Sequence, residues 1–463
     1  MVPRLLLPTG LAPLYAGVLA AAVGVFFLIR SYGETLSAGA AAVAAPAARA
    51  MPGSEVLPHI VLTVGGVLFV GRVLSRLLRQ PPVIGEILAG ILLGPSLLGA
   101  DLSARLLPPE ALPTLNVVAT LGVILFMFIV GIELDLGFVA RRAPAAVVIS
   151  HAGIVFPFLL GVMLAVVLYP TLAPGGVTFT IFALFLGVAM AMTAFPILAR
   201  ILTDQGLERT PLGRLALAVA AVGDVTAWCL LAVVVGLVRA EVGGGLWIVG
   251  GALVFIAVML LGVRPLLARV YRNWPERMTE GAVVTVFLAL FASALIADRI
   301  GIHAIFGAFL LGAITPHEGP VARFFERRMR LTVTVFLLPA FFAYTGMRTR
   351  IDFVDGIDQW LTCGVIILVA TLGKLGGVYA AARATGIATR PAAALGALMN
   401  ARGLMELIVL NIGLELGVIS PALFSLMVLM AVVTTMSSAP ILWLFLGDRE
   451  RASAPLESDP APV

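Results

Sequence analysis

Three ionisable residues lie deep inside apolar stretches of the sequence and are the first candidates for chemistry. Asp224 occurs in LAVAAVGDVTAWCLLAVVV, Lys374 in VIILVATLGKLGGVYAAA and Arg402 in ALGALMNARGLMELIVL. A charge in the middle of a membrane helix costs about 2.5 to 3.5 kcal/mol on insertion scales, so such residues are functional candidates by default. A carboxylate in a low-dielectric cavity binds either a proton or a hard monovalent cation, and never both. Asp224 is therefore the expected ion-binding residue; the alternative is a carboxyl satisfied by hydrogen bonds alone.

Lys374 is the only lysine in a chain that otherwise uses arginine for its positive charges. An ammonium can lose its proton, whereas a guanidinium in a protein stays charged. One interpretation is that Lys374 pairs with Asp224 and releases a proton when a cation binds. The other is that Lys374 is a strut that pairs with a carboxylate and holds helices together.

Arg402 lies in a segment with a helix-breaking residue. Gly403 follows it, and Pro196 occupies the matching place in a similar segment earlier in the chain. Pro and Gly are expected where broken membrane helices leave backbone carbonyls free. We expect Arg402 to compensate for these carbonyls and to form an ion pair with Glu406, one turn further along.

Three weaker candidates carry side-chain oxygens. Thr193 and Asn400 fall at the two expected breaks, where each either coordinates an ion or caps a half-helix. Glu86 follows Pro81 and Pro82 by one turn, where a carboxylate is favoured by the positive end of the helix dipole, so a structural role competes with ion binding.

The composition shows what kind of protein must position these residues. Of the 463 residues, 61% are hydrophobic and only 12% are charged. A soluble domain has about half apolar and a quarter charged residues, so the chain is an integral membrane protein with no room for a soluble catalytic domain. The basic residues are scattered in small groups, which argues against nucleic-acid binding. The two cysteines lie inside apolar runs, and we expect no metal cluster, disulfide framework or cofactor.

Apolar runs separated by charged or Pro/Gly-rich breaks predict an all-α polytopic protein with 13 or 14 transmembrane helices. The fourteen segments are 10–29, 57–79, 81–99, 114–138, 144–169, 178–202, 210–238, 245–271, 279–298, 300–316, 331–347, 358–383, 389–412 and 420–446. A roughly threefold excess of arginine in alternate loops predicts that both termini are cytoplasmic. Small residues at 45–50 leave open whether the first segment is a retained helix or a cleaved signal peptide.

Three pairs of segments predict an internal repeat. They occur in the same order at offsets of 207 to 218: GILLG (90–94) with GAFLLG (307–312), FMFIVGIELD (126–135) with FFAYTGMRTR (341–350), and MTAFP (192–196) with MNARG (399–403). Helices two to seven form one copy and helices nine to fourteen the other, with an odd linker helix between them. The copies therefore enter the membrane from opposite sides, as in secondary transporters that work by alternating access.

Several motifs together resemble the monovalent cation:proton antiporter-2 family of the sodium/hydrogen exchanger superfamily, and most closely its plant-type cation/proton exchanger branch. They are VIGEILAGILLGPSLLG (83–99), VGIELDL (130–136), AMTAFPILARIL (191–202), GRLALAVAAVGDVTAW (213–228), GIHAIFGAFLLGAITP (301–316) and MNARGLMELIVLNIG (399–413). The resemblance covers about residues 57–446. It implies a sodium/proton antiporter fold in which Asp224 matches the ion-binding carboxylate, 193–196 and 400–403 the two crossed breaks, and Lys374 the intramembrane lysine.

The same resemblance implies a domain organisation. Residues 57–142 and 278–350 would form a dimerisation domain, and 143–240 and 351–446 an ion-translocating core that slides like an elevator. Residues 241–277 would be the linker helix, 1–56 an extra N-terminal helix and outer loop, and 447–463 a short cytoplasmic tail. Because the chain ends soon after its last helix, we expect no nucleotide-sensing domain like that of potassium-efflux relatives.

Gly223 departs from the family pattern. Sodium relatives have a second aspartate at this place, and plant-type relatives have asparagine or glutamine, so cation choice and stoichiometry stay open. The leading interpretation is exchange of K⁺ or Na⁺ for protons by a homodimer in the plasma (inner) membrane, with lipid as its surroundings. The alternatives are a sodium-coupled organic solute transporter and a cation-binding sensor or channel.

Overall fold

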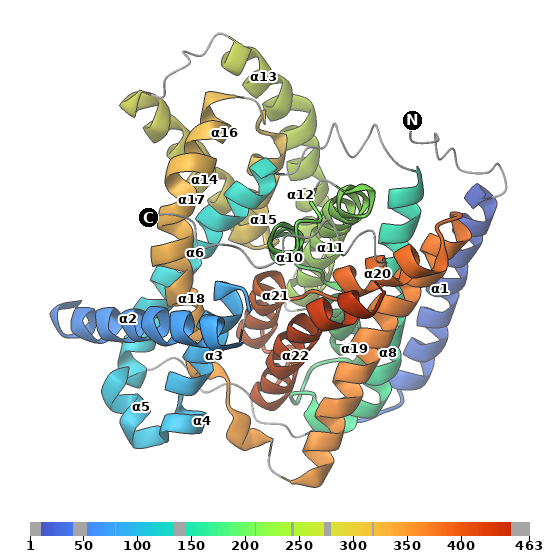
Figure 1. The fold of residues 1–463 in the computed structure, drawn as a ribbon, viewed down its shortest axis with the longest axis horizontal. Helices are drawn as coiled ribbons and strands as arrows, with labels where there is room; N and C mark the ends of the chain where they lie inside the picture. The colour runs from blue at the N-terminus through green and yellow to red at the C-terminus, as the bar shows by residue number, and fades with distance from the viewer. Residues whose placement is uncertain are drawn as a thin grey trace. The chain divides into compact units, whose positions relative to one another are not determined.

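The computed structural model describes residues 11–39, 53–78, 80–133, 144–208, 210–241, 245–272, 279–316, 319–354 and 356–445. These parts consist of helices and their connections, without a β-strand (Figure 1). Within the described ranges, eleven helices are long and apolar enough to cross a membrane, and a twelfth span results if one pair of helices bent by 45° is taken together. The protein is therefore a multi-pass, all-helical membrane protein.

Two of the fourteen segments expected from the sequence are shorter than a membrane span. α3 (Pro82–Leu93) has 12 residues and α15 (Ala304–Ile314) has 11. At 1.5 Å per residue such helices are roughly 18 Å long, against about 30 Å of bilayer core. The expected number of 13 or 14 crossing helices therefore stays a prediction. The small residues at 45–50 and the tail at 447–463 lie outside the described residues.

The chain forms two compact units. Unit 1 contains Met1–Val43, Phe138–Ala227 and Phe353–Val463, and unit 2 contains Ala44–Gly137 and Trp228–Asp352. The helices of unit 1 are α1 (Leu11–Gly33), α8 (Pro144–Leu172), α9 (Phe179–Ala191), α10 (Phe195–Asp204), the first part of α11 (Pro211–Glu241), α19 (Ile357–Ala384), α20 (Thr389–Met399), α21 (Leu404–Glu415) and α22 (Pro421–Phe445). Within it, α8 packs against α1, α9 and α19, and α22 against α19, α20 and α21.

Glycines let α8 and α19 approach closely. A Cβ atom at Gly377 would lie 2.7 Å from the Ala152 carbonyl oxygen, and one at Gly373 would lie 2.9 Å from the backbone of Pro157. Real Cβ atoms do not approach other atoms so closely, so only glycine fits at these contacts. Lys374 follows Gly373, and the close packing of the two helices therefore brings its side chain to α8.

The helices of unit 2 are shorter and more often interrupted. They are α2 (Gly53–Leu78), α3, α4 (Pro95–Leu98), α5 (Ala100–Leu106), η1 (Pro109–Ala111), α6 (Leu112–Glu133), the rest of α11, α12 (Gly245–Ala257), η2 (Val258–Val263), α13 (Arg264–Arg272), α14 (Glu280–Ile300), α15, α16 (Pro320–Phe324), η3 (Phe325–Met329), α17 (Arg330–Thr332), η4 (Val333–Leu337) and α18 (Leu338–Arg348). The short 3₁₀ helix η5 (Ile351–Phe353) ends at the boundary with unit 1.

Glycine contacts in unit 2 follow the pairing of the expected repeat. A Cβ at Gly346 of α18 would overlap the backbone of Gly90 in α3, and a Cβ at Gly131 of α6 would lie 2.9 Å from Cα of Gly312 in α15. The sequence comparison aligns Gly131 with Gly346, and α3 with α15. The short helix α3 of the first repeat thus packs on α18 of the second, and the short helix α15 of the second packs on α6 of the first. A two-fold relation between the repeats would produce this exchange, while the repeat as a whole stays a prediction.

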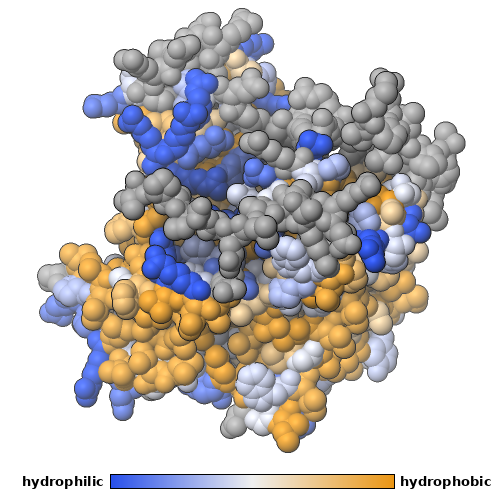
Figure 2. Space-filling model, in the orientation of Figure 1, coloured by the Kyte–Doolittle hydropathy of each residue, from blue (hydrophilic) through white to orange (hydrophobic). Residues whose placement is uncertain are grey.

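The surface carries large hydrophobic side chains. Phe69 is 72% exposed, Leu261 80% and Trp247 88%. Figure 2 shows such side chains gathered over much of the visible face. Exposure on this scale is unfavourable in water and suits helices that face lipid.

Candidate functional site

Two interrupted helices of unit 1 meet at their breaks. α9 ends at Ala191, and α10 begins at Phe195 after three extended residues. α20 ends at Met399, and α21 begins at Leu404. The Ala194 N–H donates to the Ala401 carbonyl at 3.1 Å, so the two breaks are hydrogen bonded to each other. The sequence comparison aligned these same two alanines.

The residues expected to break the helices act differently. Gly403 has φ +150°, and a Cβ there would overlap the side chain of Ile197. The backbone conformation therefore favours glycine, and a Cβ there would also force the end of the Ile197 side chain to move. Pro196 is the second residue of α10, where the missing N–H leaves no helical hydrogen bond unmade. Pro196 thus starts the second half-helix, and the interruption itself lies at 192–194.

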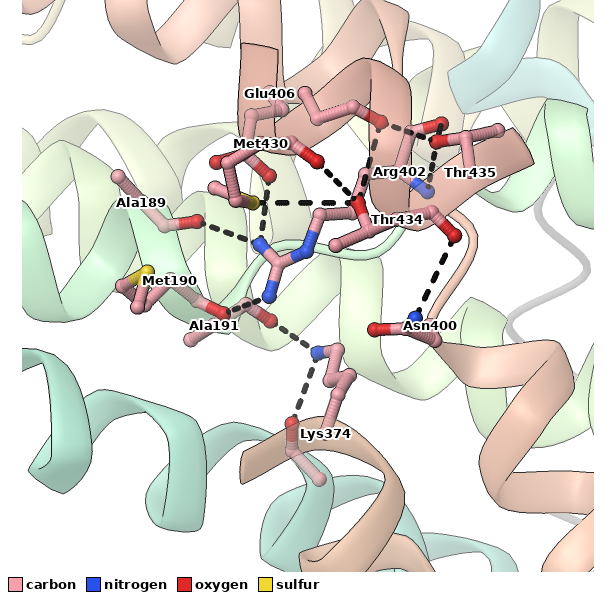
Figure 3. A network of polar contacts seen from close by, with 12 residues as sticks. Ala189, Met190, Ala191, Lys374, Asn400, Arg402, Glu406, Met430, Thr434 and Thr435 are labelled. Carbon is pink, nitrogen blue, oxygen red and sulfur yellow. Dashed lines mark hydrogen bonds and ion pairs between the residues drawn. The ribbon is translucent and has the colours of Figure 1, made fainter. Parts of the chain in front are cut away.

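Arg402 is fully buried and caps the end of α9 (Figure 3). Its Nη1 donates to the Ala189 carbonyl at 3.2 Å, and its Nη2 to the Met190 carbonyl at 2.7 Å. Its Nη1 also lies 2.7 Å from Oε2 of Glu406, which is the ion pair expected from their spacing. The last carbonyls of a helix have no intrahelical partner and carry partial negative charge, so a guanidinium stabilises this end.

Lys374 completes the same cap. Its Nζ donates to the Gly153 carbonyl of α8 at 2.8 Å and to the Ala191 carbonyl at the end of α9. Both bonds are drawn in Figure 3. Among the described residues it forms no ion pair with Asp224 within 4 Å. The geometry therefore favours the interpretation of Lys374 as a strut, with backbone carbonyls rather than a carboxylate as its direct partners.

Asp224 lies within α11 and is 2% exposed. Its carboxyl is within electrostatic reach of the Phe195 backbone N–H, at the start of α10, and of the Lys374 ammonium. Its Oδ2 has no hydrogen-bond partner among the described residues. Burial disfavours a charge on this carboxyl, the helix N-terminus and the ammonium partly offset that cost, and one oxygen is free to bind.

A small cavity reaches Gly223, the residue before Asp224. It has a volume of about 10 Å³, and its lining includes Ser150, Thr193, Gly223 and Lys374. This is room for about one water molecule. Thr193, from the first break, therefore faces a space that an ion or a water molecule could enter.

Asn400, from the second break, is fully buried. Its Nδ2 is 3.5 Å from the Thr434 carbonyl, and its Oδ1 has no partner among the described residues. The second break thus has one side-chain oxygen without a partner, and the first break contributes Thr193 to the cavity lining.

Sequence reasoning missed the hydroxyl groups that hold and line the site. The Thr435 hydroxyl accepts from the Arg402 N–H at 3.0 Å and lies 2.8 Å from the Arg402 carbonyl, which fixes the second break. Ser150 lines the cavity. Ser150 is an isolated serine in an apolar run and Thr435 is one of four hydroxyl residues at 434–438, so the sequence singles out neither for a site.

Glu86 lies in unit 2 and is 3% exposed. It packs against α2, where a Cβ at Gly71 would lie 2.9 Å from its Cα, and Arg72 acts on it electrostatically. It does not belong to the cluster of unit 1. The described residues contain no group of three side chains that could hold a resident metal ion.

Known proteins show which family the chain belongs to. Residues 64–444 match the family model described as sodium/hydrogen exchanger, transmembrane. The Na(+)/H(+) antiporter NhaS4 of Synechocystis sp. is 40% identical and covers 71% of this chain and 82% of its own length. Cation/H(+) antiporter 19 of Arabidopsis thaliana is 37% identical and covers 72% of this chain, and K(+)/H(+) antiporter 1 of Saccharomyces cerevisiae is 32% identical and covers 76%.

The chain spans only 42% of the length of these plant and yeast relatives. The sodium proton antiporter MjNhaP1 from Methanocaldococcus jannaschii has a similar structure, with a TM-score of 0.57, 14% identity and coverage of 84% of this chain and 96% of its own. At this identity the likeness shows the fold. With the family model matching most of its length, the chain belongs to the sodium/hydrogen exchanger family of transmembrane proteins.

Proposed function

We propose that the protein is a secondary antiporter that exchanges a monovalent cation, K⁺ or Na⁺, for protons by alternating access. The relatives are named as cation/H⁺, Na⁺/H⁺ and K⁺/H⁺ antiporters, which does not favour a solute carrier or a channel. The observation that carries the proposal is the buried Asp224 carboxyl with an unpartnered oxygen, beside the meeting point of two broken helices.

The chemistry follows from one carboxyl group. As a carboxylate, Asp224 attracts a cation, and the side-chain oxygens of Thr193 and Asn400 at the two breaks would be its further hard ligands. When Asp224 takes up a proton, the charge that held the cation is lost, so the two cargoes compete for one site. Arg402 and Lys374 compensate the helix end of α9, which leaves Asp224 as the group that changes charge.

The proposal includes an assembly and an orientation. Residues 143–240 and 351–446 would move as the ion-translocating core, and 57–142 and 278–350 would form the dimer contact of a homodimer, joined by 241–277. The protein would lie in the plasma membrane with both termini cytoplasmic. The loop charges of the sequence support this orientation.

The test is exchange by purified protein in liposomes that contain a pH-sensitive dye. We expect added Na⁺ or K⁺ to drive proton movement in the wild type and Asp224→Asn to abolish it, because an amide has nearly the same size but no charge to exchange. Asp298→Asn is the matched control, since Asp298 is 47% exposed at the end of α14. Substantial exchange by Asp224→Asn would overturn the assignment, and Glu86 and Glu406 would be the next candidates.

A further inference from the structure

Ser150 has an unusual environment for a hydroxyl inside an apolar helix. It is 3% exposed, and its Oγ has no hydrogen-bond partner among the described residues. Several other hydroxyls donate to the carbonyl four residues earlier, namely Thr226, Ser425, Thr434 and Ser438 within helices and Thr315 and Thr349 at helix ends. Ser150 makes no such bond to Ala146. A buried polar group without a partner costs roughly 1 to 3 kcal/mol, so this one is expected to bind something.

The direction of the Ser150 hydroxyl identifies where that ligand would lie. A Cβ atom at Gly223 would be 3.1 Å from Ser150 Oγ, so the hydroxyl of α8 points at the residue next to Asp224 on α11. Both residues line the same cavity, together with Thr193 and Lys374. Because Gly223 has no side chain, the Ser150 hydroxyl can approach the backbone of α11.

The chemistry of the cavity selects the kind of ligand. Lys374 Nζ already donates to two carbonyls, while Ser150 Oγ and Asp224 Oδ2 both have unused lone pairs. The hydroxyl offers oxygen lone pairs next to the residue that precedes Asp224, and such oxygens suit a hard cation better than an anion or an organic molecule. The volume of about 10 Å³ excludes anything larger than a single ion or water.

We propose that the Ser150 hydroxyl is a ligand of the transported cation, and that Ser150 and Gly223 together set cation affinity and preference. The inference rests on the proposed antiport function. Gly223 has no side chain at the cavity, and the Ser150 hydroxyl of α8 supplies an oxygen ligand in its place. The site would thus combine a carboxylate that changes charge with a neutral hydroxyl that does not.

The first measurement is cation affinity by two readouts. In liposomes, Ser150→Ala should raise KM for the preferred cation roughly tenfold with kcat and the pH profile largely kept, since one cation ligand is worth about as much as a hydrogen bond to a charged group. In detergent at alkaline pH, the same cation should raise the melting temperature of the wild type more than that of Ser150→Ala, because a ligand stabilises only the state it binds. Ser425→Ala on α22, which removes a back-bonded hydroxyl, should leave KM unchanged.

A second set of variants moves the oxygen from one helix to the other. Gly223→Ala places a methyl group 3.1 Å from Ser150 Oγ and should displace the hydroxyl and raise KM. The double variant Ser150→Ala, Gly223→Ser removes that conflict and restores an oxygen from α11, so it should bind the cation more tightly than Ser150→Ala and change the K⁺ to Na⁺ preference. Gly223→Ala keeps Ser150 and therefore also tests the proposal if Ser150→Ala fails to fold.

The outcomes separate this inference from the function on which it rests. Unchanged KM, cation preference and cation-dependent melting in Ser150→Ala, in a protein whose Asp224→Asn variant is inactive, would overturn the role of Ser150 and leave the antiport function standing. Absence of exchange in the wild type would overturn the function instead. Cation-dependent melting would then still decide whether Ser150 contributes to a binding site.

Discussion

The ion pairs of the two units differ in burial. In unit 1, Arg402 and Glu406 form an ion pair at 2.7 Å with both side chains fully buried. In unit 2, Arg330 and Glu133 form a pair of the same length, but the arginine side chain is 51% exposed and the glutamate 15%. Unit 1 buries the Arg402 charge where a helix is interrupted. The carbonyls at 189–191 have no hydrogen-bond partner within their own helix, so they need donors that a continuous helix would not require.

The difference in burial predicts a large difference in energy. Arg402→Met leaves two carbonyls and the Glu406 carboxylate unpaired in the interior, which should destabilise the protein by about 3 to 5 kcal/mol or prevent folding. Arg330→Met breaks an exposed pair and should cost about 1 kcal/mol or less. Thermal unfolding in detergent, followed by size-exclusion chromatography, measures both. Similar losses for the two variants would show that burial does not decide the energy of these pairs.

The core of unit 2 depends on backbone contact instead of charge. Gly346→Ala inserts a methyl group into the backbone of Gly90 and should lower the free energy of unfolding by roughly 1 to 3 kcal/mol. Gly364→Ala in α19 is the matched control, because a Cβ there meets no atom within 4 Å. The control should be neutral or slightly stabilising, since alanine favours a helix over glycine. A stable Gly346→Ala protein would contradict the close approach of α3 and α18.

The sequence predicts the interactions between residues close together in the chain better than those between distant helices. The Arg402–Glu406 pair was predicted from its spacing of four residues, although Arg402 lies just before α21 and not within it. The break at Gly403 was predicted because glycine tolerates backbone conformations that few other residues adopt. The partners of Lys374 were not, since Gly153 and Ala191 belong to other helices and act through backbone carbonyls that sequence patterns do not mark. Ser150 was missed for the same reason: its importance depends on which residue of α11 it faces.

The hydropathy of the sequence does not fix the number of helices that cross the membrane. Hydropathy located α3 and α15 as apolar segments, but it did not show where their helices end. Gly94 is extended and the residues after it form short, separate helices, while Thr315 ends α15. These terminations are set by turns and by packing against α18 and α6, which an apolar run does not reveal.

Lys374 offers a finer test of what the buried charges of unit 1 do. As a strut whose partners are carbonyls, it should be partly replaceable by glutamine, which still donates hydrogen bonds. Lys374→Gln should lose roughly 1 to 3 kcal/mol of stability but keep electroneutral exchange. Transport under an imposed potassium/valinomycin potential, with Na⁺ as cargo, measures voltage dependence in both proteins. A voltage-dependent wild type with an electroneutral variant would instead make Lys374 a proton carrier.

The smallest effect is expected at an exposed pair of unit 2. Arg350 donates to Asp352 at 2.5, 2.8 and 3.1 Å, and these bonds lower the pKa of the Asp352 carboxyl below its usual value. A carboxyl whose pKa is lower in the folded than in the unfolded protein stabilises the fold above the unfolded pKa, and this stabilisation is lost as the pH falls through the folded value. Asp352 is 45% exposed, so solvent screening limits the gain to about 1 kcal/mol or less.

Asp352→Asn should therefore melt slightly below the wild type at neutral pH, and the two melting temperatures should converge as the pH falls below about 4. Melting curves of the two proteins in detergent across this pH range give the difference directly, and high salt should reduce it at neutral pH. A difference that is constant with pH would mean that the pair acts through geometry, for instance through Ser96, whose hydroxyl lies 3.5 Å from Asp352 Oδ1, and not through its charge. The difference in stability between the Arg350–Asp352 and Arg402–Glu406 pairs would then come from the burial of their hydrogen bonds and not from the burial of their charges.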